Sequence, residues 1–215
     1  MGYIIAVDGP AGAGKSTVAK QLAKALNFTY IDSGAMYRSF TLNLIENKVN
    51  IENENEVLDL LTNTDISFMG KKILVDNKDV TKKIRSKEVD NLVSRISTIP
   101  EVRHILIANQ RKISANKDVV MDGRDIGTVV FPNANIKIYL TADVEERAKR
   151  RTAENISKGI KINYEEILSE IKKRDTTDQD RVISPLRPAE DAILIDTTHK
   201  TVEEVVNEIL AIMEG

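Results

Sequence analysis

"GPAGAGKST", residues 9–17, is the stretch that decides the fold of this chain. It fits the pattern G-x-x-x-x-G-K-[S/T], in which a glycine-rich turn leads into a lysine and a hydroxyl residue. The apolar run YIIAVDG at 3–9 precedes it and predicts a strand, while residues 15–26 follow it with helical spacing. A strand, this loop and a helix, in that order, predict a phosphate-binding loop (P-loop).

Each part of the loop has a predicted role toward a nucleoside triphosphate. Gly12 and Gly14 allow the backbone to wrap closely, so that successive N–H groups point at phosphate oxygens. Lys15 is expected to reach the β and γ phosphates. Ser16 is expected to offer its hydroxyl to Mg²⁺, whose other ligands would be mostly phosphate and water. The predicted nucleotide-binding residues are Gly9, Pro10, Ala11, Gly12, Ala13, Gly14, Lys15, Ser16 and Thr17.

The composition excludes several other kinds of protein. The 215 residues are 41% hydrophobic and 30% charged, and 31 Lys and Arg nearly balance 33 Asp and Glu. The formal net charge of -2 provides no global field to hold a nucleic-acid polymer or an acidic membrane. No cysteine and only two histidines exclude a disulfide framework and a histidine-rich metal centre. No apolar run is long enough to cross a bilayer, so we expect a cytoplasmic protein.

Strands alternate with helices along the chain. Short runs rich in Ile, Val and Tyr, without strict polar alternation, are typical of parallel strands covered on both faces. They lie at 3–9, 28–32, 118–122, 136–141 and 192–196. Helical patterns lie at 15–26, 34–47, two around 86–115 broken at Pro100, 143–158, 163–175 and 201–213. The order predicts an α/β fold with a doubly wound, five-stranded parallel sheet.

Two segments do not fit that alternation. Residues 65–84 predict a small antiparallel β insert, with Gly70 at one turn and DNKD at 76–79 at the next. Residues 150–181 are rich in charge, have few large apolar residues and contain Gly159 between two helical patterns, which indicates a hinged flap over a site. A solvated pair of helices is the alternative for 150–181, and charge alone favours it.

A P-loop serves switches, motors and transferases, and the sequence favours a transferase. GTP-dependent switches usually carry N-K-x-D, but NKDV at 77–80 and at 116–119 lacks the final Asp. Motors usually need a longer chain or partner proteins. A flap on a 215-residue chain is better suited to closing a small acceptor off from water.

Residues for the acceptor are expected after the strands, because ligands of open α/β sheets bind outside the carboxyl ends of the strands. IDSGAMYR at 31–38 follows the second strand at once. Asp32 and Ser33 are expected to cap the helix that begins near Gly34. Arg38, about one turn further on, could then reach a phosphate at that helix start.

A second cluster of charges follows the strand VVMD at 119–122. Asp122 resembles a Walker B acid that orders the P-loop or the Mg²⁺ water shell. Arg124 suits a phosphate, and Asp125 suits a donor on the acceptor. Because unpaired buried charges are costly, we expect these residues at the mouth of the crevice, solvated when it is empty and paired when it is full.

The chain resembles the bacterial cytidylate kinases, which phosphorylate CMP and dCMP. Five blocks carry the resemblance in order and at similar spacing: GPAGAGKST, IDSGAMYR, DGRDIGTVVFP, KKRDTTDQDR and SPLRPAEDAILIDT. The resemblance implies a P-loop core at 1–33, 86–149 and 182–215. It also implies a monophosphate-binding region with the antiparallel insert at about 34–85, and a helical lid at about 150–181. The chain departs from the family pattern at Thr177, where arginine is common, and at Asp180.

The resemblance also assigns the acceptor contacts. It implies that Ser33, Arg38 and Arg124 hold the acceptor phosphate, and that Ser94, Arg103 and Asp125 surround cytosine. Arg174, Asp178 and Arg181, spaced i, i+4, i+7, would contact phosphate and sugar, and they share one face if their helix continues. The resemblance also implies that lid arginines neutralise charge on the transferring phosphoryl group. The candidates for this role are Arg147, Arg150 and Arg151.

The implied reaction transfers the γ-phosphoryl group of MgATP to CMP or dCMP, giving CDP or dCDP and ADP. The expected partners are these small molecules, with Mg²⁺ as cofactor, no nucleic-acid polymer, no membrane and a monomeric chain. Two alternatives remain: a P-loop kinase for another small acceptor, such as UMP or a metabolite hydroxyl, and a nucleotide-gated binding module.

Overall fold

The computed structural model describes residues 2–70, 72–157, 159 and 163–214. The chain forms two compact units. The sheet unit comprises residues 1–31 and 116–215, and the helical unit comprises 32–115.

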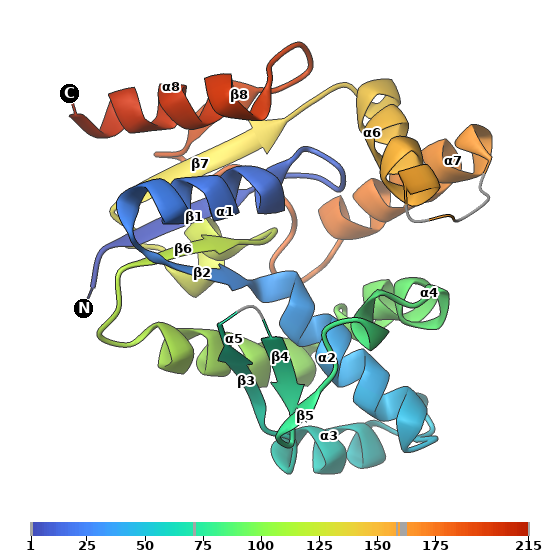
Figure 1. Cartoon of the computed structure of the whole chain (residues 1–215). Helices are drawn as coiled ribbons and strands as arrows, with labels where there is room; N and C mark the ends of the chain where they lie inside the picture. Colours follow the sequence, from blue (N-terminus) through green and yellow to red (C-terminus); the bar gives the residue numbers. More distant parts are fainter. Residues whose placement is uncertain (1, 71, 158, 160–162, 215) are drawn as a thin grey trace. The chain divides into compact units, whose positions relative to one another are not determined.

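The sheet unit is built on the predicted five-stranded parallel sheet (Figure 1). Its strands are β1 (Ile4–Asp8), β2 (Thr29–Asp32), β6 (Val119–Asp122), β7 (Ile136–Thr141) and β8 (Ile193–Asp196), in the spatial order β2-β6-β1-β7-β8. Every residue of the central strand β1 is buried, as expected for a strand covered on both faces. The carboxyl ends of β1 and β6 therefore lie side by side, with Val7 paired to Asp122.

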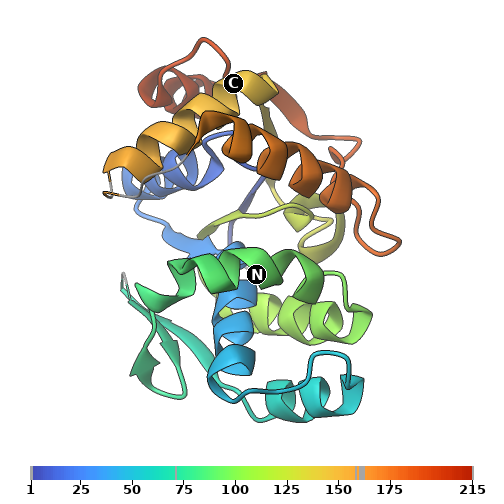
Figure 2. The ribbon, with the colours of Figure 1, turned by 90° about the vertical axis from the view of Figure 1, so that its right-hand side faces the viewer.

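The α-helices in the described part of this unit are α1 (Lys15–Leu26), α6 (Val144–Ser157), α7 (Tyr164–Gln179) and α8 (Val202–Glu214). Apolar side chains of α1 and α8 pack with those of the strands in one core cluster. Helices α6 and α7 lie side by side (Figure 2) and share a smaller cluster around Ala148, Ile167 and Ile171. The doubly wound prediction is confirmed.

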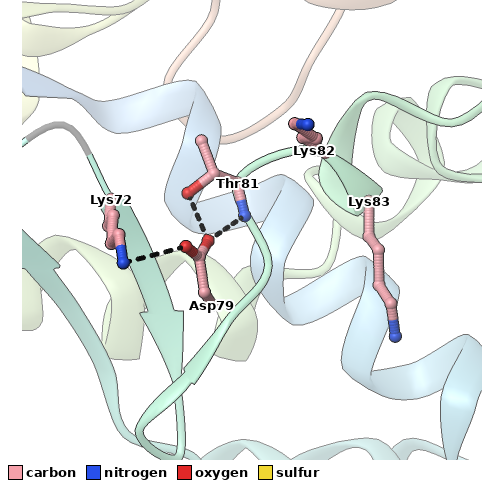
Figure 3. A pocket seen from close by; sticks show the side chains of 5 residues that line it. All are labelled: Lys72, Asp79, Thr81, Lys82 and Lys83. Atoms are coloured by element: carbon pink, nitrogen blue, oxygen red, sulfur yellow. Dashed lines mark hydrogen bonds and ion pairs between the residues drawn. The ribbon is translucent and has the colours of Figure 1, made fainter.

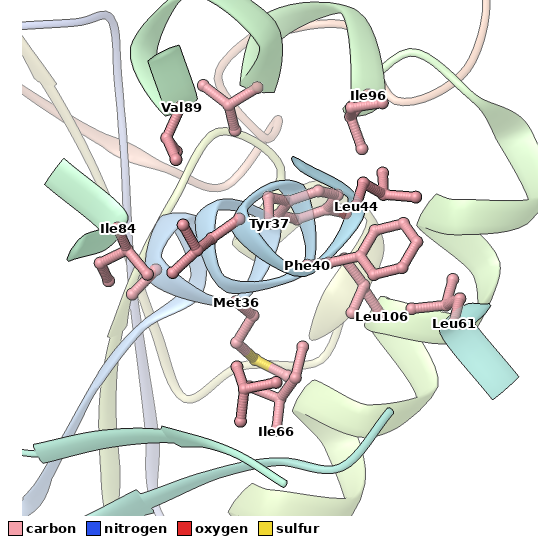
Figure 4. Packing of buried hydrophobic residues seen from close by; sticks show 14 of the residues in the cluster. Met36, Tyr37, Phe40, Leu44, Leu61, Ile66, Ile84, Val89, Ile96 and Leu106 are labelled. Carbon is pink, nitrogen blue, oxygen red and sulfur yellow. The ribbon is translucent and has the colours of Figure 1, made fainter. Parts of the chain in front are cut away.

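The helical unit is organised around α2 (Ser33–Glu46), of which eleven residues, Ser33 and Ala35–Leu44, are buried. Figure 4 shows side chains of α2, including Met36, Phe40 and Leu44, surrounded by apolar residues of the other elements. These elements are α3 (Glu54–Thr62), α4 (Lys87–Ile96), α5 (Pro100–Ser114), a 3₁₀ turn (Lys83–Arg85), and the antiparallel strands β3 (Ile66–Met69), β4 (Lys72–Val75) and β5 (Lys78–Asp79).

The antiparallel insert is confirmed as a three-stranded sheet. Gly70 has a φ of 59°, and Asp76 and Asn77 also have positive φ, as a tight turn between β4 and β5 requires. The sequence analysis did not predict α3, and α7 continues to Gln179, beyond the predicted end at 175.

The compact units divide the chain differently from the prediction, since residues 32 and 33 and helices α4 and α5 fall in the helical unit. Helices α4 and α5 were expected in the P-loop core, but their apolar faces pack with α2, so they belong to the helical unit. The helical lid at 150–181 stays a prediction, and residues 158 and 160–162 of it lie outside the described part. In the described ranges, no helix has the length and apolar character needed to span a membrane.

Candidate active site

The P-loop connects β1 to α1, as predicted. Gly9 has a φ of 144°, and a Cβ there would lie 2.0 Å from the carbonyl oxygen of Leu140. Gly14 is the N-cap of α1 and has a left-handed conformation, with φ 85°. Both positions therefore require glycine, the first for close approach to β7 and the second for its backbone angle. The loop presents its backbone at the start of α1, where the helix end favours anions.

Lys15 folds back over its own loop. Its Nζ donates a 2.7 Å hydrogen bond to the Pro10 carbonyl, and the residue is only 6% exposed. Burial, followed by the charge of Arg124, lowers the pKa of Lys15 well below its usual value, although Asp122 acts in the opposite direction. A phosphate in the loop would add negative charge beside this ammonium and favour its charged form.

The predicted Walker B residue contacts the P-loop directly. Ser16 Oγ donates to Asp122 Oδ2 at 2.8 Å, and the Tyr30 hydroxyl donates to Oδ1 at 2.7 Å. A hydroxyl and a carboxylate side by side fit Mg²⁺, which typically takes one or two protein oxygens and completes its shell with phosphate and water. No group of three or more acidic, His or Cys side chains that could hold a metal occurs among the described residues.

The charges of DGRDIG are already paired within the chain. Arg124 Nε donates to Asp178 Oδ2 at 2.8 Å, and Arg181 donates to the other oxygen of the same carboxylate. Asp178 is 1% exposed. Burial alone would raise its pKa, but Arg124, Arg181 and Arg174 together hold the pKa below its usual value. The same pairing raises the pKa of Arg124 against the effect of burial.

That these charges are solvated when the crevice is empty and paired when it is full stays a prediction. Asp122 is 4% exposed and Asp125 6% exposed, so both carboxylates are buried within the chain. Intramolecular partners, such as Asp178 for Arg124 and the hydroxyls of Ser16 and Tyr30 for Asp122, offset the cost of burial.

The three arginines predicted to act from the lid differ in their surroundings. Arg147 donates through Nε to the Ala142 carbonyl at 2.9 Å and through a terminal nitrogen to the P-loop carbonyl of Ala11 at 3.0 Å. The same terminal nitrogen pairs with Asp175, whose other oxygen accepts the Ala11 N–H at 3.3 Å. Of the three, Arg147 is therefore the one placed on the P-loop.

Arg150 and Arg151 have other partners. Arg150 donates to the carbonyl and hydroxyl oxygens of Thr197, and the Thr197 hydroxyl in turn donates to the carbonyl of Ala13 at 3.3 Å. Arg151 pairs with Glu154 on the surface of α6. The sequence analysis missed Asp175 and Thr197, although Asp175 stands directly beside the predicted Arg174.

DGRDIG continues into a single π-helical turn, Ile126–Val130. The carbonyl of Asp125 accepts the N–H groups of Val129 and Val130. On the other side of the turn, the carboxylate of Asp8 accepts the N–H of Ile126 at 2.8 Å and that of Gly127 at 2.7 Å. Asp8, the last residue of β1, is a further contributor that the sequence analysis did not single out.

In the helical unit, Asp32 caps α2 by accepting the Ala35 N–H at 2.9 Å, so that the helix begins at Ser33. Its second oxygen accepts a 2.7 Å bond from Arg85. Arg38 is 6% exposed and donates to the Ile84 carbonyl at 3.1 Å.

Arg38 also pairs with Asp90 of α4 at 2.5 Å. The predicted phosphate-binding guanidinium is thus held by two fixed acceptors, because the Ile84 carbonyl and Asp90 both belong to elements packed on α2.

Arg103 is the largest fully buried side chain of the helical unit. It donates to the Ser97 carbonyl at 3.1 Å, and its guanidinium lies 5.6 Å from the centroid of the Tyr37 ring. The Ser97 hydroxyl donates to the carbonyl of Ser94, which connects the two predicted base-contacting positions. Arg103 is therefore a buried side chain with fixed contacts and not a solvated one.

The predicted acceptor residues come from both units. Ser33, Arg38, Ser94 and Arg103 belong to the helical unit, whereas Arg124, Asp125, Arg174, Asp178 and Arg181 belong to the sheet unit. Within the sheet unit, the structure brings Arg124, Asp178 and Arg181 together. That all nine residues serve one acceptor stays a prediction.

A pocket of about 410 Å³ lies on the small antiparallel sheet (Figure 3). It is lined by Lys72, Asp79, Thr81, Lys82 and Lys83, none of which is a predicted site residue. Asp79 is bound by Thr81 and by Lys72, and the lysines are exposed. The candidate site therefore consists of the residues described above and not of this pocket.

Comparison with known proteins identifies the family. The family model described as cytidylate kinase matches residues 5–215. The chain belongs to the cytidylate kinase family. It is 55% identical over 213 residues to the cytidylate kinase of Carboxydothermus hydrogenoformans, covering 97% of this chain and 96% of that protein. It is 51% identical over 206 residues to that of Fusobacterium nucleatum, covering 96% and 94%. The chain is thus an enzyme, a nucleoside monophosphate kinase.

Solved structures support the fold at low sequence identity. A gluconokinase from Sinorhizobium meliloti superposes with a TM-score of 0.53 at 14% identity, covering 98% of this chain and 90% of that one. A shikimate kinase from Acinetobacter baumannii gives 0.51 at 17% identity, with 99% and 93% covered. These similarities concern the P-loop kinase fold alone.

Proposed function

We propose that this member of the family transfers the γ-phosphoryl group of MgATP to the 5′-phosphate of CMP or dCMP, giving the diphosphate and ADP. The observation that carries the proposal is the P-loop itself. Lys15 and the hydrogen-bonded pair of Ser16 and Asp122 are assembled at the start of α1, in a chain whose relatives are cytidylate kinases along almost their whole length.

On the donor side, the N–H groups of residues 9–17 and the ammonium of Lys15 would bind the triphosphate. Arg147, already bonded to the loop carbonyl of Ala11, would neutralise charge on the transferring group. Ser16, with Asp122 behind it, would hold Mg²⁺. When bound, the metal offsets the negative charge on the phosphate oxygens.

On the acceptor side, Ser33, Arg38 and Arg124 would bind the monophosphate. This proposal is supported by the hydrogen bonds that hold both guanidiniums in place. Arg38 is held by the Ile84 carbonyl and Asp90, and Arg124 by Asp178. Guanidiniums fixed before binding lose little conformational freedom when phosphate arrives.

The base would be recognised by Asp125 and Arg103, with Ser94 as a further contact. Cytosine presents a donor at N4 and acceptors at N3 and O2, which complement a carboxylate and a guanidinium. Arg103 is buried beside Tyr37 and bonded to the Ser97 carbonyl, which fixes the position of its guanidinium. UMP would mismatch both contacts, because it has an acceptor at position 4 and a donor at N3.

No side-chain base is required for the reaction. The attacking oxygen belongs to a phosphate that is already ionised, so catalysis depends on in-line positioning and on neutralising charge. Arg174, Asp178 and Arg181 would contribute to the sugar and phosphate contacts, with Asp178 also keeping two arginines in place.

Product formation with a panel of acceptors tests the proposal. Purified enzyme with MgATP is incubated with CMP, dCMP, UMP and AMP in turn, and diphosphate products are separated by chromatography. We expect CDP and dCDP as the main products. A preference for UMP would favour the alternative acceptor, and tight ATP binding without any product from the panel would favour a nucleotide-gated binding module.

A further inference from the structure

Asp8 is a buried carboxylate at the carboxyl end of the central strand of the sheet unit. It is the last residue of β1, directly before the first glycine of the P-loop, and it is 5% exposed. Nothing in the proposed reaction requires a carboxylate there, because Asp122 already serves the loop serine. A buried carboxylate is costly unless it is well bonded, so its bonds indicate what it stabilises.

Both bonds go to the turn that carries the predicted base reader. One carboxylate oxygen accepts the Ile126 N–H at 2.8 Å and the other accepts the Gly127 N–H at 2.7 Å. These are the two peptide groups immediately after Asp125. Since the carbonyl of Asp125 accepts the N–H groups of two later residues in the turn, its backbone is fixed from both sides.

The fit around the turn is tight. A Cβ at Gly127 would lie 3.2 Å from side-chain carbons of Lys137 and 3.4 Å from an oxygen of Asp8. The turn therefore rests on Asp8 on one side and on β7 on the other. Because the packing is tight, a residue of different length or charge at position 8 would shift the peptide groups next to Asp125.

We infer that Asp8 is a positioning residue for base selectivity, acting through Asp125 by holding the backbone of the turn Ile126–Val130. The inference rests on the proposed function, because it assigns a support to the predicted contact with cytosine N4. A residue that only anchored the P-loop would instead change the KM for ATP.

The electrostatic surroundings make the support dependent on pH. Burial, together with the nearby charge of Asp125, raises the pKa of Asp8 to about 6, although its two backbone hydrogen bonds and Lys15 lower it. Tyr139 of β7 also faces this charge, and its own pKa is raised by burial and by Asp8. The ionised carboxylate accepts both N–H groups, whereas the protonated one turns an O–H toward a donor and loses part of the support.

The test compares Asp8→Asn with wild type by kcat/KM for CMP and for UMP. Asparagine has similar volume but is neutral and has only one acceptor oxygen, so one of the two buried N–H groups loses its acceptor and the other keeps only an uncharged one. We expect kcat/KM for CMP to fall by about 10- to 100-fold, with a much smaller loss for UMP and little change in the KM for ATP. Asp118→Asn is the matched control, because Asp118 accepts a backbone N–H from Tyr3 at the opposite end of the sheet.

A double-mutant cycle shows whether Asp8 acts through Asp125. Adding Asp8→Asn to Asp125→Ala should change the ratio of kcat/KM for CMP to that for UMP very little, since the contact it supports is already lost. A full additional loss in the double mutant, or a rise in the KM for ATP as large as the loss for CMP, overturns the inference.

The wild-type pH profile tests the same point without any substitution. Between about pH 5.5 and pH 8 the preference for CMP over UMP should fall as pH decreases through about 6, because Asp8 becomes protonated there. Ionisation of the substrate phosphates affects both substrates alike and cancels in the ratio. Should Asp8→Asn fail to fold, a flat wild-type profile alone overturns the inference. A wild-type enzyme without any CMP preference overturns the proposed function itself, whereas a preference that Asp8→Asn retains overturns only the role of Asp8.

Discussion

Replacing Asp178 with asparagine is expected to destabilise the enzyme strongly, because this carboxylate compensates several buried cations. It is 1% exposed, bonded to Arg124 at 2.8 Å and to Arg181, and close enough to Arg174 for that charge to lower its pKa. Asparagine retains the volume but removes the charge. It also turns an amide N–H₂ toward one of the two guanidiniums.

The magnitude follows from the burial. Removing one partner of a buried ion pair costs about 3 to 5 kcal/mol, because the remaining charge is left without compensation in a poorly solvated place. For a chain of this size each kcal/mol corresponds to about 2 to 4 °C, so the melting temperature should fall by about 6 to 20 °C.

Thermal and urea unfolding, followed by circular dichroism, measure this change. Asp180→Asn is the matched control, because Asp180 lies two residues further along, is exposed, and should change the free energy of unfolding by no more than about 0.5 kcal/mol. An Asp178→Asn protein as stable as the Asp180→Asn protein would refute the view that this carboxylate holds the arginine cluster together.

Sulfate offers a second readout of the same cluster. With its acid removed, the group of Arg124, Arg174 and Arg181 should bind a divalent anion more favourably than in wild type. Added sodium sulfate should therefore raise the melting temperature of Asp178→Asn more than that of wild type or Asp180→Asn, with sodium chloride at equal ionic strength as the control. Equal stabilisation of all three proteins would show that no anion site has been opened.

Four further predictions concern the donor loop, the base contact, the buried aspartate and the lid. Lys15→Met should abolish phosphoryl transfer with the fold retained, as measured by product formation and circular dichroism; a folded, active mutant would contradict the role of Lys15. Asp125→Ala should lower kcat/KM for CMP by about 5- to 150-fold while affecting UMP much less. Equal losses for both would mean that Asp125 orders the site without reading the base. The pKa of Asp8 is raised from 3.8 to about 6, so its neutral form stabilises the fold below pH 4 and this contribution is lost as pH rises through 6. Relative to Asp8→Asn, wild type should lose about 3 kcal/mol of unfolding free energy over that range, and parallel pH profiles would disprove the shift. Residues 150–181 should become protected from proteolysis when ATP and CMP are both bound, and unchanged cleavage would remove the lid assignment.

The sequence predicts the parallel sheet well because its signals are local. Buried parallel strands are short apolar runs, and the P-loop pattern requires glycine at positions such as Gly9, where β7 leaves no room for a side chain. Helix α3 was missed because its stretch, rich in Asn and Glu, has only two buried residues, Val57 and Leu61.

The partners of the site residues could not be read from the sequence. Asp8 and Asp175 act through backbone groups more than 100 residues away in the chain, Ile126 and Ala11 respectively. Such contacts depend on which strand ends and helices become neighbours, and no local pattern encodes them. The pairing of Arg124 with Asp178 likewise joins residues 54 positions apart.

The most direct test of the proposed reaction follows the phosphoryl group itself. ATP labelled in its γ-phosphate is mixed with Mg²⁺, CMP and the wild-type enzyme, and the labelled products are separated. We expect the label to appear in CDP in proportion to the ADP formed. Label found only as inorganic phosphate, or no transfer to CMP while another acceptor is labelled, would contradict it.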